Sequence, residues 1–126
     1  MFQDRARRID ITVGEVRETH RLLKEAREEL KARKVPSRDS LPLGVMIETP
    51  AAAMAADMFV RDGTVSFFSI GTNDLVQYTL AVDRGNANLA QRFTALHPAV
   101  LRLIERTVEV GEEAHIEVAV CGEMAS

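Results

Sequence analysis

Residues able to do chemistry stand directly after apolar runs in this sequence. Glu48 follows one such run, and Cys121 ends another. Asn73 and Asp74 stand close behind a third run. If these runs are parallel strands, their carboxyl ends face the same side, where α/β proteins place their sites. Arg84 lies in a later loop that we expect to fold over that side, so the pattern predicts a single site.

Two carboxylates and one amide give this set a metal-binding and anion-binding character. Glu48 and Asp74 can together hold a hard divalent cation, because Mg²⁺ takes one or two carboxylates, waters and phosphate oxygens. Alternatively, Glu48 pairs with a neighbouring arginine and Asp74 only caps the helix that follows it. Asn73 offers an amide N–H to an anion beside a helix N-terminus, or it is simply a turn residue.

Arg84 and Cys121 add anion recognition and proton transfer. Arg84 can hold a phosphate or carboxylate through two parallel hydrogen bonds, or it is a surface residue of the turn at residues 83–86. Cys121 can give or take a proton if its pKa is tuned, and the alternative is a small buried hydrophobic residue. The histidines have no partner at metal-ligand spacing, and we interpret all of them as structural or exposed: His20, His97 and His115.

Alternating helices and strands must position these residues. The sequence from Thr12 to Glu15 has the pattern of a capping box, which predicts a helix to about Lys34. A linker follows at 36–42. Further helices are predicted over 50–60, 75–82 and 98–114, strands over 43–47, 65–70 and 116–120, and a loop over 71–74. This alternation predicts an α/β fold with a parallel sheet.

Apolar periodicity predicts which helical side chains face the core. In the first helix, one narrow apolar stripe is formed by Val16, Leu22, Leu23, Ala26 and Leu30. We interpret this helix as solvated, because its acidic and basic residues are interleaved. In the last helix, Leu101, Ile104 and Val108 are predicted to face inward.

Composition excludes several classes of protein. The 126 residues are 46% hydrophobic and 28% charged, as in globular domains. No run approaches the roughly 18 apolar residues of a membrane span, and without a secretory leader we expect a cytoplasmic protein. One cysteine cannot form an internal disulfide. The net charge of −3 gives no general attraction to nucleic acid, and acids interleave with the basic residues of the first helix.

Four stretches of the sequence resemble the signatures of phosphoenolpyruvate-utilising enzymes. They are GVMIETPAA at 44–52, FFSIGTNDL at 67–75, QYTLAVDR at 77–84 and CGEMA at 121–125. Together they resemble most closely enzyme I of the bacterial phosphotransferase system. Pyruvate phosphate dikinase and phosphoenolpyruvate synthase share the middle motifs and form the alternative family.

The resemblance implies a phosphoenolpyruvate-binding (β/α)8 barrel, of which this chain covers about half. Residues 1–11 are then an irregular terminus, and residues 12–126 are βα units. By resemblance, Glu48 and Asp74 are the Mg²⁺ ligands. Asn73 and Asp74 contact phosphoenolpyruvate, while Arg84 holds its phosphate. Cys121 corresponds to the acid that protonates carbon 3 of the enolate as pyruvate forms.

The resemblance also implies a reaction and its partners. Phosphate moves from phosphoenolpyruvate to an enzyme histidine and then to HPr for sugar uptake, through a region that precedes this one in the family. Because the acceptor histidine and several arginines of the family have no counterpart here, we expect the isolated chain to be inactive. The second hypothesis is a non-catalytic association module, since half a barrel leaves two sheet edges that favour a homo-oligomer.

Overall fold

Helices and strands alternate along the part of the chain that the structure describes, which is residues 12–83, 85, 96–122 and 124. The structure is a computed structural model. Its elements are α1 (Val13–Ala32), β1 (Gly44–Ile47), α2 (Pro50–Met54), α3 (Ala56–Val60), β2 (Phe67–Gly71), α4 (Thr72–Leu80), α5 (Pro98–Glu113) and β3 (Glu117–Cys121). The expected terminus at 1–11 lies outside the described residues.

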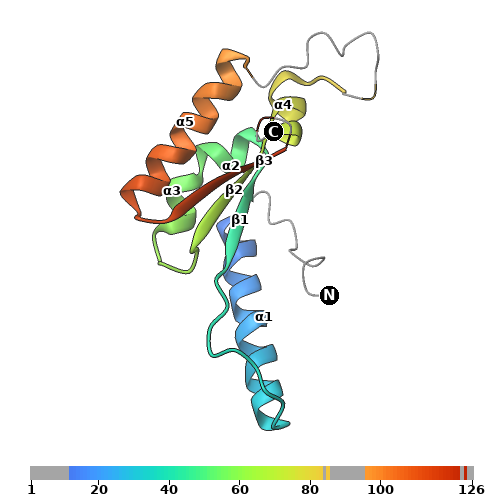
Figure 1. The fold of residues 1–126 in the computed structure, drawn as a ribbon, viewed down its shortest axis with the longest axis vertical. Helices are drawn as coiled ribbons and strands as arrows, with labels where there is room; N and C mark the ends of the chain where they lie inside the picture. The colour runs from blue at the N-terminus through green and yellow to red at the C-terminus, as the bar shows by residue number, and fades with distance from the viewer. Residues whose placement is uncertain (1–11, 84, 86–95, 123, 125–126) are drawn as a thin grey trace.

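The three strands form one parallel sheet in the order β1-β2-β3 (Figure 1). Met46 pairs with Ser69, and Ser69 with Ala119. The ladder between β2 and β3 ends at the pair Gly71 and Cys121. This arrangement confirms the predicted α/β class with parallel strands, and it is the arrangement of consecutive units in a (β/α)8 barrel. The carboxyl ends of all three strands therefore lie side by side at the same end of the sheet.

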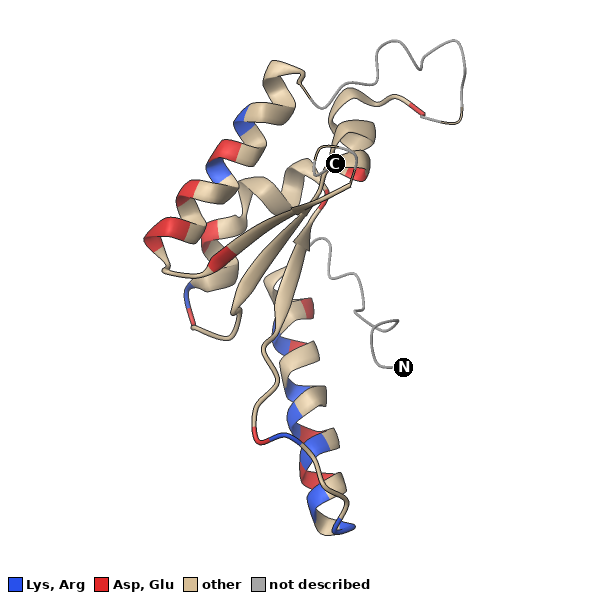
Figure 2. Cartoon of the chain, in the orientation of Figure 1, with Lys and Arg blue, Asp and Glu red and all other residues tan. Residues whose placement is uncertain are grey.

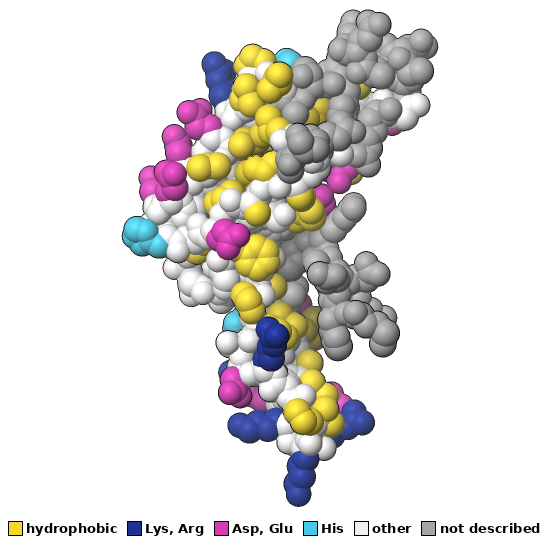
Figure 3. Space-filling model, viewed as in Figure 1, with side chains coloured by type: hydrophobic (Ala, Val, Ile, Leu, Met, Phe, Trp, Pro, Cys, Tyr) yellow, Lys and Arg dark blue, Asp and Glu magenta, His cyan; other side chains and the backbone are white. Residues whose placement is uncertain are grey.

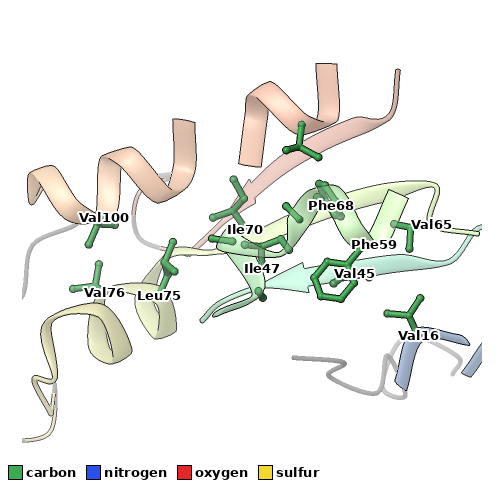
Figure 4. Packing of buried hydrophobic residues seen from close by; sticks show 14 residues of the cluster. Val16, Val45, Ile47, Phe59, Val65, Phe68, Ile70, Leu75, Val76 and Val100 are labelled. Atoms are coloured by element: carbon green, nitrogen blue, oxygen red, sulfur yellow. The ribbon is translucent and has the colours of Figure 1, made fainter. Parts of the chain in front are cut away.

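The hydrophobic core lies between the sheet and helices α2, α3 and α5, which lie together on one side of it (Figure 1). Alternate strand residues face these helices and are buried: Val45, Ile47, Phe68 and Ile70. Figure 4 shows Val76 of α4 and Val100 of α5 pointing toward each other, so α4 also packs on α5. The predicted burial of Leu101 is wrong, because 39% of this residue is exposed and its neighbour Val100 is the buried one.

The other set of strand residues is more exposed. Ala119 is exposed, and Phe67 retains 37% of its accessible surface. The Phe67 ring lies against Gly44, where a Cβ atom would come within 2.1 Å of it. Hydrophobic side chains are visible on the surface over the sheet and near the far end of α1 in Figure 3. In a complete barrel, this face of the sheet would point into the interior and pack against side chains from the other strands.

Helix α1 begins as the sequence predicts and then leaves the rest of the fold. The Thr12 hydroxyl accepts from the Glu15 N–H at 3.2 Å, and the Glu15 carboxylate accepts from the Thr12 N–H at 3.0 Å, which completes the capping box. Within α1 only Val16 is buried. The helix extends away from the sheet (Figure 1), and Leu22 and Leu23 of its apolar stripe are 41% and 37% exposed.

Charged residues are interleaved along α1, whereas acids predominate on α5 (Figure 2). Arg21 forms ion pairs with Glu18 and Glu25, and Arg33 pairs with Glu29 at 3.9 Å. The hydrogen bond from Arg21 lowers the pKa of Glu18 below its ordinary value. These local pairs confirm the interpretation of α1 as a solvated helix. None of the helices in the described part combines the length and the apolar character needed to cross a membrane.

Two helices differ from the prediction. The expected helix over 50–60 is divided into α2 and α3 at Ala55, whose φ of −96° and ψ of 9° depart from helical values. The Met58 N–H then bonds to the Ala55 carbonyl at 2.9 Å, a tighter turn than the α-helical one. The expected loop at 71–74 is wrong, since α4 begins at Thr72 directly after β2.

Candidate functional site

One pocket of about 140 Å³ lies at the carboxyl ends of the strands. Its lining comes from all three strand ends and from the first turn of α4: Met46, Glu48, Gly71, Thr72, Asn73, Asp74, Cys121 and Gly122. The structure therefore brings together four of the residues singled out in the sequence, from segments up to 73 positions apart. Arg84 lies outside the described residues.

Glu48 occupies the pocket wall at the end of β1 and is only 2% exposed. Its side chain passes over Gly71, where a Cβ atom would lie 3.0 Å from Glu48 Oε2 and 3.1 Å from Glu48 Cβ. The glycine at the end of β2 therefore makes room for the carboxylate. Burying a carboxylate in this way is costly unless hydrogen bonds or a cation compensate its charge.

The first turn of α4 supplies a second part of the pocket lining. Gly71 is its N-cap and makes no side-chain capping bond, so Asp74 is the third helical residue and not the cap. Asn73 and Asp74 are both half-buried. The first turn of a helix has N–H groups without intrahelical acceptors and the positive end of the helix dipole. This part of the lining is therefore suited to anionic oxygens, while Asp74 adds a carboxylate to it.

Cys121 is held by hydrogen bonds at both its side chain and its main chain. Its thiol donates to the Ile70 carbonyl at 3.3 Å, and the Ser69 hydroxyl donates to its Sγ atom at 3.4 Å. The Thr72 hydroxyl donates to the Cys121 carbonyl at 3.1 Å. The residue is half-buried and lines the pocket, so it differs from a cysteine that only fills a core.

Ser69 and Thr72 were not identified from the sequence. Ser69 lies on the same face of the sheet as Gly71 and Cys121, because side chains alternate along β2 and β3. Strand alternation therefore contained a signal for Ser69, although not for its sulfur contact. Thr72 had no such signal, because its role depends on α4 starting one residue after β2.

The donor atoms of the pocket fit Mg²⁺ better than softer metals. Glu48 and Asp74 offer two carboxylates, and Mg²⁺ commonly takes one or two, completed by water and phosphate oxygens. Within the described residues, no group of three or more His, Cys, Asp or Glu side chains gathers as a closed zinc site requires. The pocket is therefore suited to a metal that the substrate helps to bind.

Comparison with known proteins identifies the family. Residues 10–126 match the family described as PEP-utilising enzyme, PEP-binding domain. This chain belongs to that family. The match covers every described residue of the pocket and confirms the resemblance seen in the sequence.

Individual relatives carry two names. The phosphoenolpyruvate-protein phosphotransferase of Cupriavidus necator is 45% identical over 112 residues, which are 89% of this chain and 19% of the relative. The protein of that name from Listeria monocytogenes is 42% identical over 114 residues, 90% of this chain and 20% of the relative. A probable phosphoenolpyruvate synthase of Archaeoglobus fulgidus is 48% identical over 105 residues, 79% of this chain and 14% of the relative. The chain thus spans a fifth or less of these relatives.

Proposed function

We propose that the pocket binds phosphoenolpyruvate together with Mg²⁺ and serves a phosphoenolpyruvate-protein phosphotransferase. The observation that carries the proposal is the gathering of Glu48, Asp74 and Cys121 around one pocket at the strand ends. Two carboxylates suit a metal that carries a phosphorylated substrate, and a thiol suits delivery of a proton to carbon. Membership of the PEP-binding family supports the choice of ligand.

Each residue has a distinct proposed role in binding. Glu48 and Asp74 hold the metal, which when bound neutralises charge on the phosphate and carboxylate oxygens of the substrate. The Asn73 amide and the first-turn N–H groups of α4 orient the anionic substrate. Arg84 grips the phosphate through its guanidinium.

Cys121 supplies the proton that converts the enolate into pyruvate. As the bond between phosphorus and the enol oxygen breaks, the phosphoryl group passes to its acceptor and the electron pair stays on the oxygen, which gives the enolate. The enolate oxygen then forms the carbonyl of pyruvate while the C=C electron pair takes the proton at carbon 3. The S–H bond of Cys121 then breaks, a C–H bond forms, and the resulting thiolate recovers a proton from water. The Ser69 hydroxyl already donates to Sγ, so it can keep this hydrogen bond to the sulfur when the thiol gives up its proton.

We propose that the phosphoryl group passes to a histidine of the enzyme and next to HPr, for sugar uptake. The names of the relatives from Listeria and Cupriavidus support a protein acceptor. Since the proposed thiol acts only in its reduced form, we also propose a cytoplasmic setting.

A phosphoenolpyruvate synthase or dikinase is the alternative, which the similarity to the Archaeoglobus protein favours. The two functions share the pocket and differ in the phosphoryl acceptor.

Self-association is a second candidate function, with another copy of this chain as the partner. Strands β1 and β3 are the outer strands of the described sheet, and Phe67 and Val120 expose apolar surface on it. Outer strands with apolar neighbours readily pair with another chain. Light scattering at micromolar concentration is expected to show a dimer or larger assembly, and a monomer would count against this candidate.

Calorimetric titration with oxalate, an analogue of the pyruvate enolate, tests the proposed site. We expect oxalate to bind only with Mg²⁺, and Glu48→Gln to weaken that binding by at least about tenfold. Glu109→Gln is the matched control, since Glu109 is an exposed residue of α5 outside the pocket lining. Oxalate binding that needs no Mg²⁺, or that survives Glu48→Gln, would refute the proposed site.

A further inference from the structure

We propose that Thr72 is a positioning residue, whose hydroxyl fixes the end of β3 against the start of α4 and so places the Cys121 thiol beside Asn73 and Asp74. The catalytic value of this placement rests on the proposed function. The contact between Thr72 and Cys121 is independent of that function and can be tested without substrate.

The Thr72 side chain joins the start of α4 to the end of β3, one residue beyond the last pair of the ladder between β2 and β3. The last register pair joins Gly71 with Cys121. One residue further on, Thr72 is fully buried and its Oγ1 donates to the Cys121 carbonyl at 3.1 Å. Thr72 is also the first residue of α4, directly before Asn73. One hydroxyl therefore joins the segment with the thiol to the segment with the proposed substrate and metal ligands.

Gly122 shows how closely the two segments approach. A Cβ atom on this residue would lie 2.5 Å from Thr72 Oγ1 and 3.3 Å from Asn73 Oδ1. Its φ of +108° lies in a region that residues with a side chain rarely adopt. The chain after Cys121 thus passes directly over Thr72, at a distance that only glycine allows.

The other contacts of Cys121 depend on this placement of its main chain. The sulfur makes two hydrogen bonds, at 3.3 Å to the Ile70 carbonyl and 3.4 Å from the Ser69 hydroxyl. A thiol is a weak donor and a weak acceptor, so these bonds orient the side chain without fixing the strand end. The O–H···O bond from Thr72 acts on the carbonyl of the same residue. Thr72 sets where the thiol is, and Ser69 sets how it points.

Thiol alkylation measures the proposed effect directly, because Cys121 is the single cysteine of the chain. We expect Thr72→Val to raise the rate of reaction with iodoacetamide by about threefold to tenfold, as expected for losing one hydrogen bond. Thr72→Ser keeps the hydroxyl and should return the rate to within about twofold of the parent chain.

Thr107→Val is the matched control. Thr107 is also fully buried, and its hydroxyl donates to the Leu103 carbonyl at 2.8 Å, but within α5 and outside the pocket. We expect this variant to lose a comparable bond without a change in the alkylation rate. If Thr107→Val accelerates alkylation as much as Thr72→Val does, the effect is general loosening and the proposal is overturned.

The remaining outcomes also decide the proposal. If circular dichroism shows that Thr72→Val does not fold, Thr72→Ala replaces it, because it also removes the hydroxyl that bonds to the Cys121 carbonyl. An unchanged alkylation rate in the folded variant overturns the proposal. No Mg²⁺ or oxalate is present in these reactions, so failure of the parent chain to bind oxalate refutes the proposed function and leaves the role of Thr72 standing.

Discussion

The Glu48 carboxylate owes its position to the absence of a side chain at Gly71. The two residues lie at the ends of neighbouring strands, and a methyl group at Gly71 would contact both Oε2 and Cβ of Glu48. Gly71 has a φ of −83°, which alanine adopts without strain. The glycine is therefore needed for space and not for backbone conformation.

We predict that Gly71→Ala keeps the fold and weakens Mg²⁺-dependent oxalate binding by about tenfold, because the new methyl group displaces one proposed ligand. Titration calorimetry measures this, with circular dichroism to verify the fold. Gly14→Ala is the control, since a Cβ there meets only Thr12 Oγ1 at 3.8 Å. Equal oxalate affinities for Gly71→Ala and the parent chain would show that Glu48 is not a ligand.

Asp62 gives the turn between α3 and β2 a dependence on pH. Its Oδ1 accepts from the Thr64 hydroxyl at 2.7 Å and from the Thr64 N–H at 3.1 Å. These bonds, and a weaker contribution from Arg17, lower the pKa of Asp62 below its ordinary value. A carboxyl with a lowered pKa in the folded state stabilises the fold above its unfolded-state pKa. That stability is lost as the pH falls through the folded-state pKa.

We therefore predict that Asp62→Asn lowers the thermal unfolding midpoint at pH 7, and that this difference shrinks as the pH falls below the ordinary aspartate pKa of about 3.9 and disappears only below the lower folded-state pKa. Thermal melts of both chains across this range measure the difference. Asp39→Asn, at an exposed position between α1 and β1, is the control. A difference between Asp62→Asn and the parent that stays constant with pH would contradict this explanation.

At the scale of elements, α5 and β3 approach each other through another glycine. A Cβ atom on Gly111 would lie 2.2 Å from Cγ2 of Val118, well inside contact distance. Gly111 is buried in the last turn of α5, where alanine would otherwise favour the helix by about 1 kcal/mol. Steric fit and helix propensity therefore oppose each other at this position.

We predict that the steric term is larger and that Gly111→Ala lowers the free energy of unfolding by about 1–2 kcal/mol, since overpacking costs about 1–3 kcal/mol. Gly14 in α1 has room for a methyl group, so Gly14→Ala should raise the free energy of unfolding or leave it unchanged. Urea denaturation of both variants measures the two effects. If Gly111→Ala raised the free energy of unfolding, β3 would have to shift readily to make room for the methyl group. That result would also count against Cys121, at the end of β3, being held in one position.

Elements set by local chemistry were predictable from the sequence. The capping box at Thr12 and Glu15 forms within one turn, and Pro50 and Pro98 begin α2 and α5 as expected. The start of α4 was missed because its N-cap, Gly71, offers no side-chain capping bond. The division at Ala55 was missed because an alanine-rich segment contains no residue that breaks a helix.

Features that depend on distant parts of the chain were less predictable. The α1 stripe has helical spacing, but whether Leu22 and Leu23 are buried depends on what packs against them. For the site, the position of Glu48, Asp74 and Cys121 after predicted parallel strands indicated correctly that the three residues lie at one pocket. The same pattern did not identify Thr72, whose bond to Cys121 joins residues 49 positions apart.

At the scale of the whole molecule, the histidines of this chain lie apart from the proposed site. His20 is exposed on α1, His97 is the N-cap of α5, and exposed His115 follows the end of that helix. None of them is among the described residues that line the pocket. Phosphoryl transfer needs an acceptor held in line with the breaking bond, and the described part of this chain does not place a histidine there.

We therefore predict that the 126-residue chain binds oxalate with Mg²⁺ but releases no pyruvate from phosphoenolpyruvate. Its described pocket lining carries two carboxylates and no Lys or Arg, so phosphate charge is incompletely balanced there. A lactate dehydrogenase-coupled assay measures pyruvate, with the Listeria phosphoenolpyruvate-protein phosphotransferase and its protein acceptor as the positive control. Pyruvate formation that disappears in Cys121→Ala would contradict this prediction, because it would show that these residues suffice for turnover. Absence of both turnover and oxalate binding would instead favour the association module.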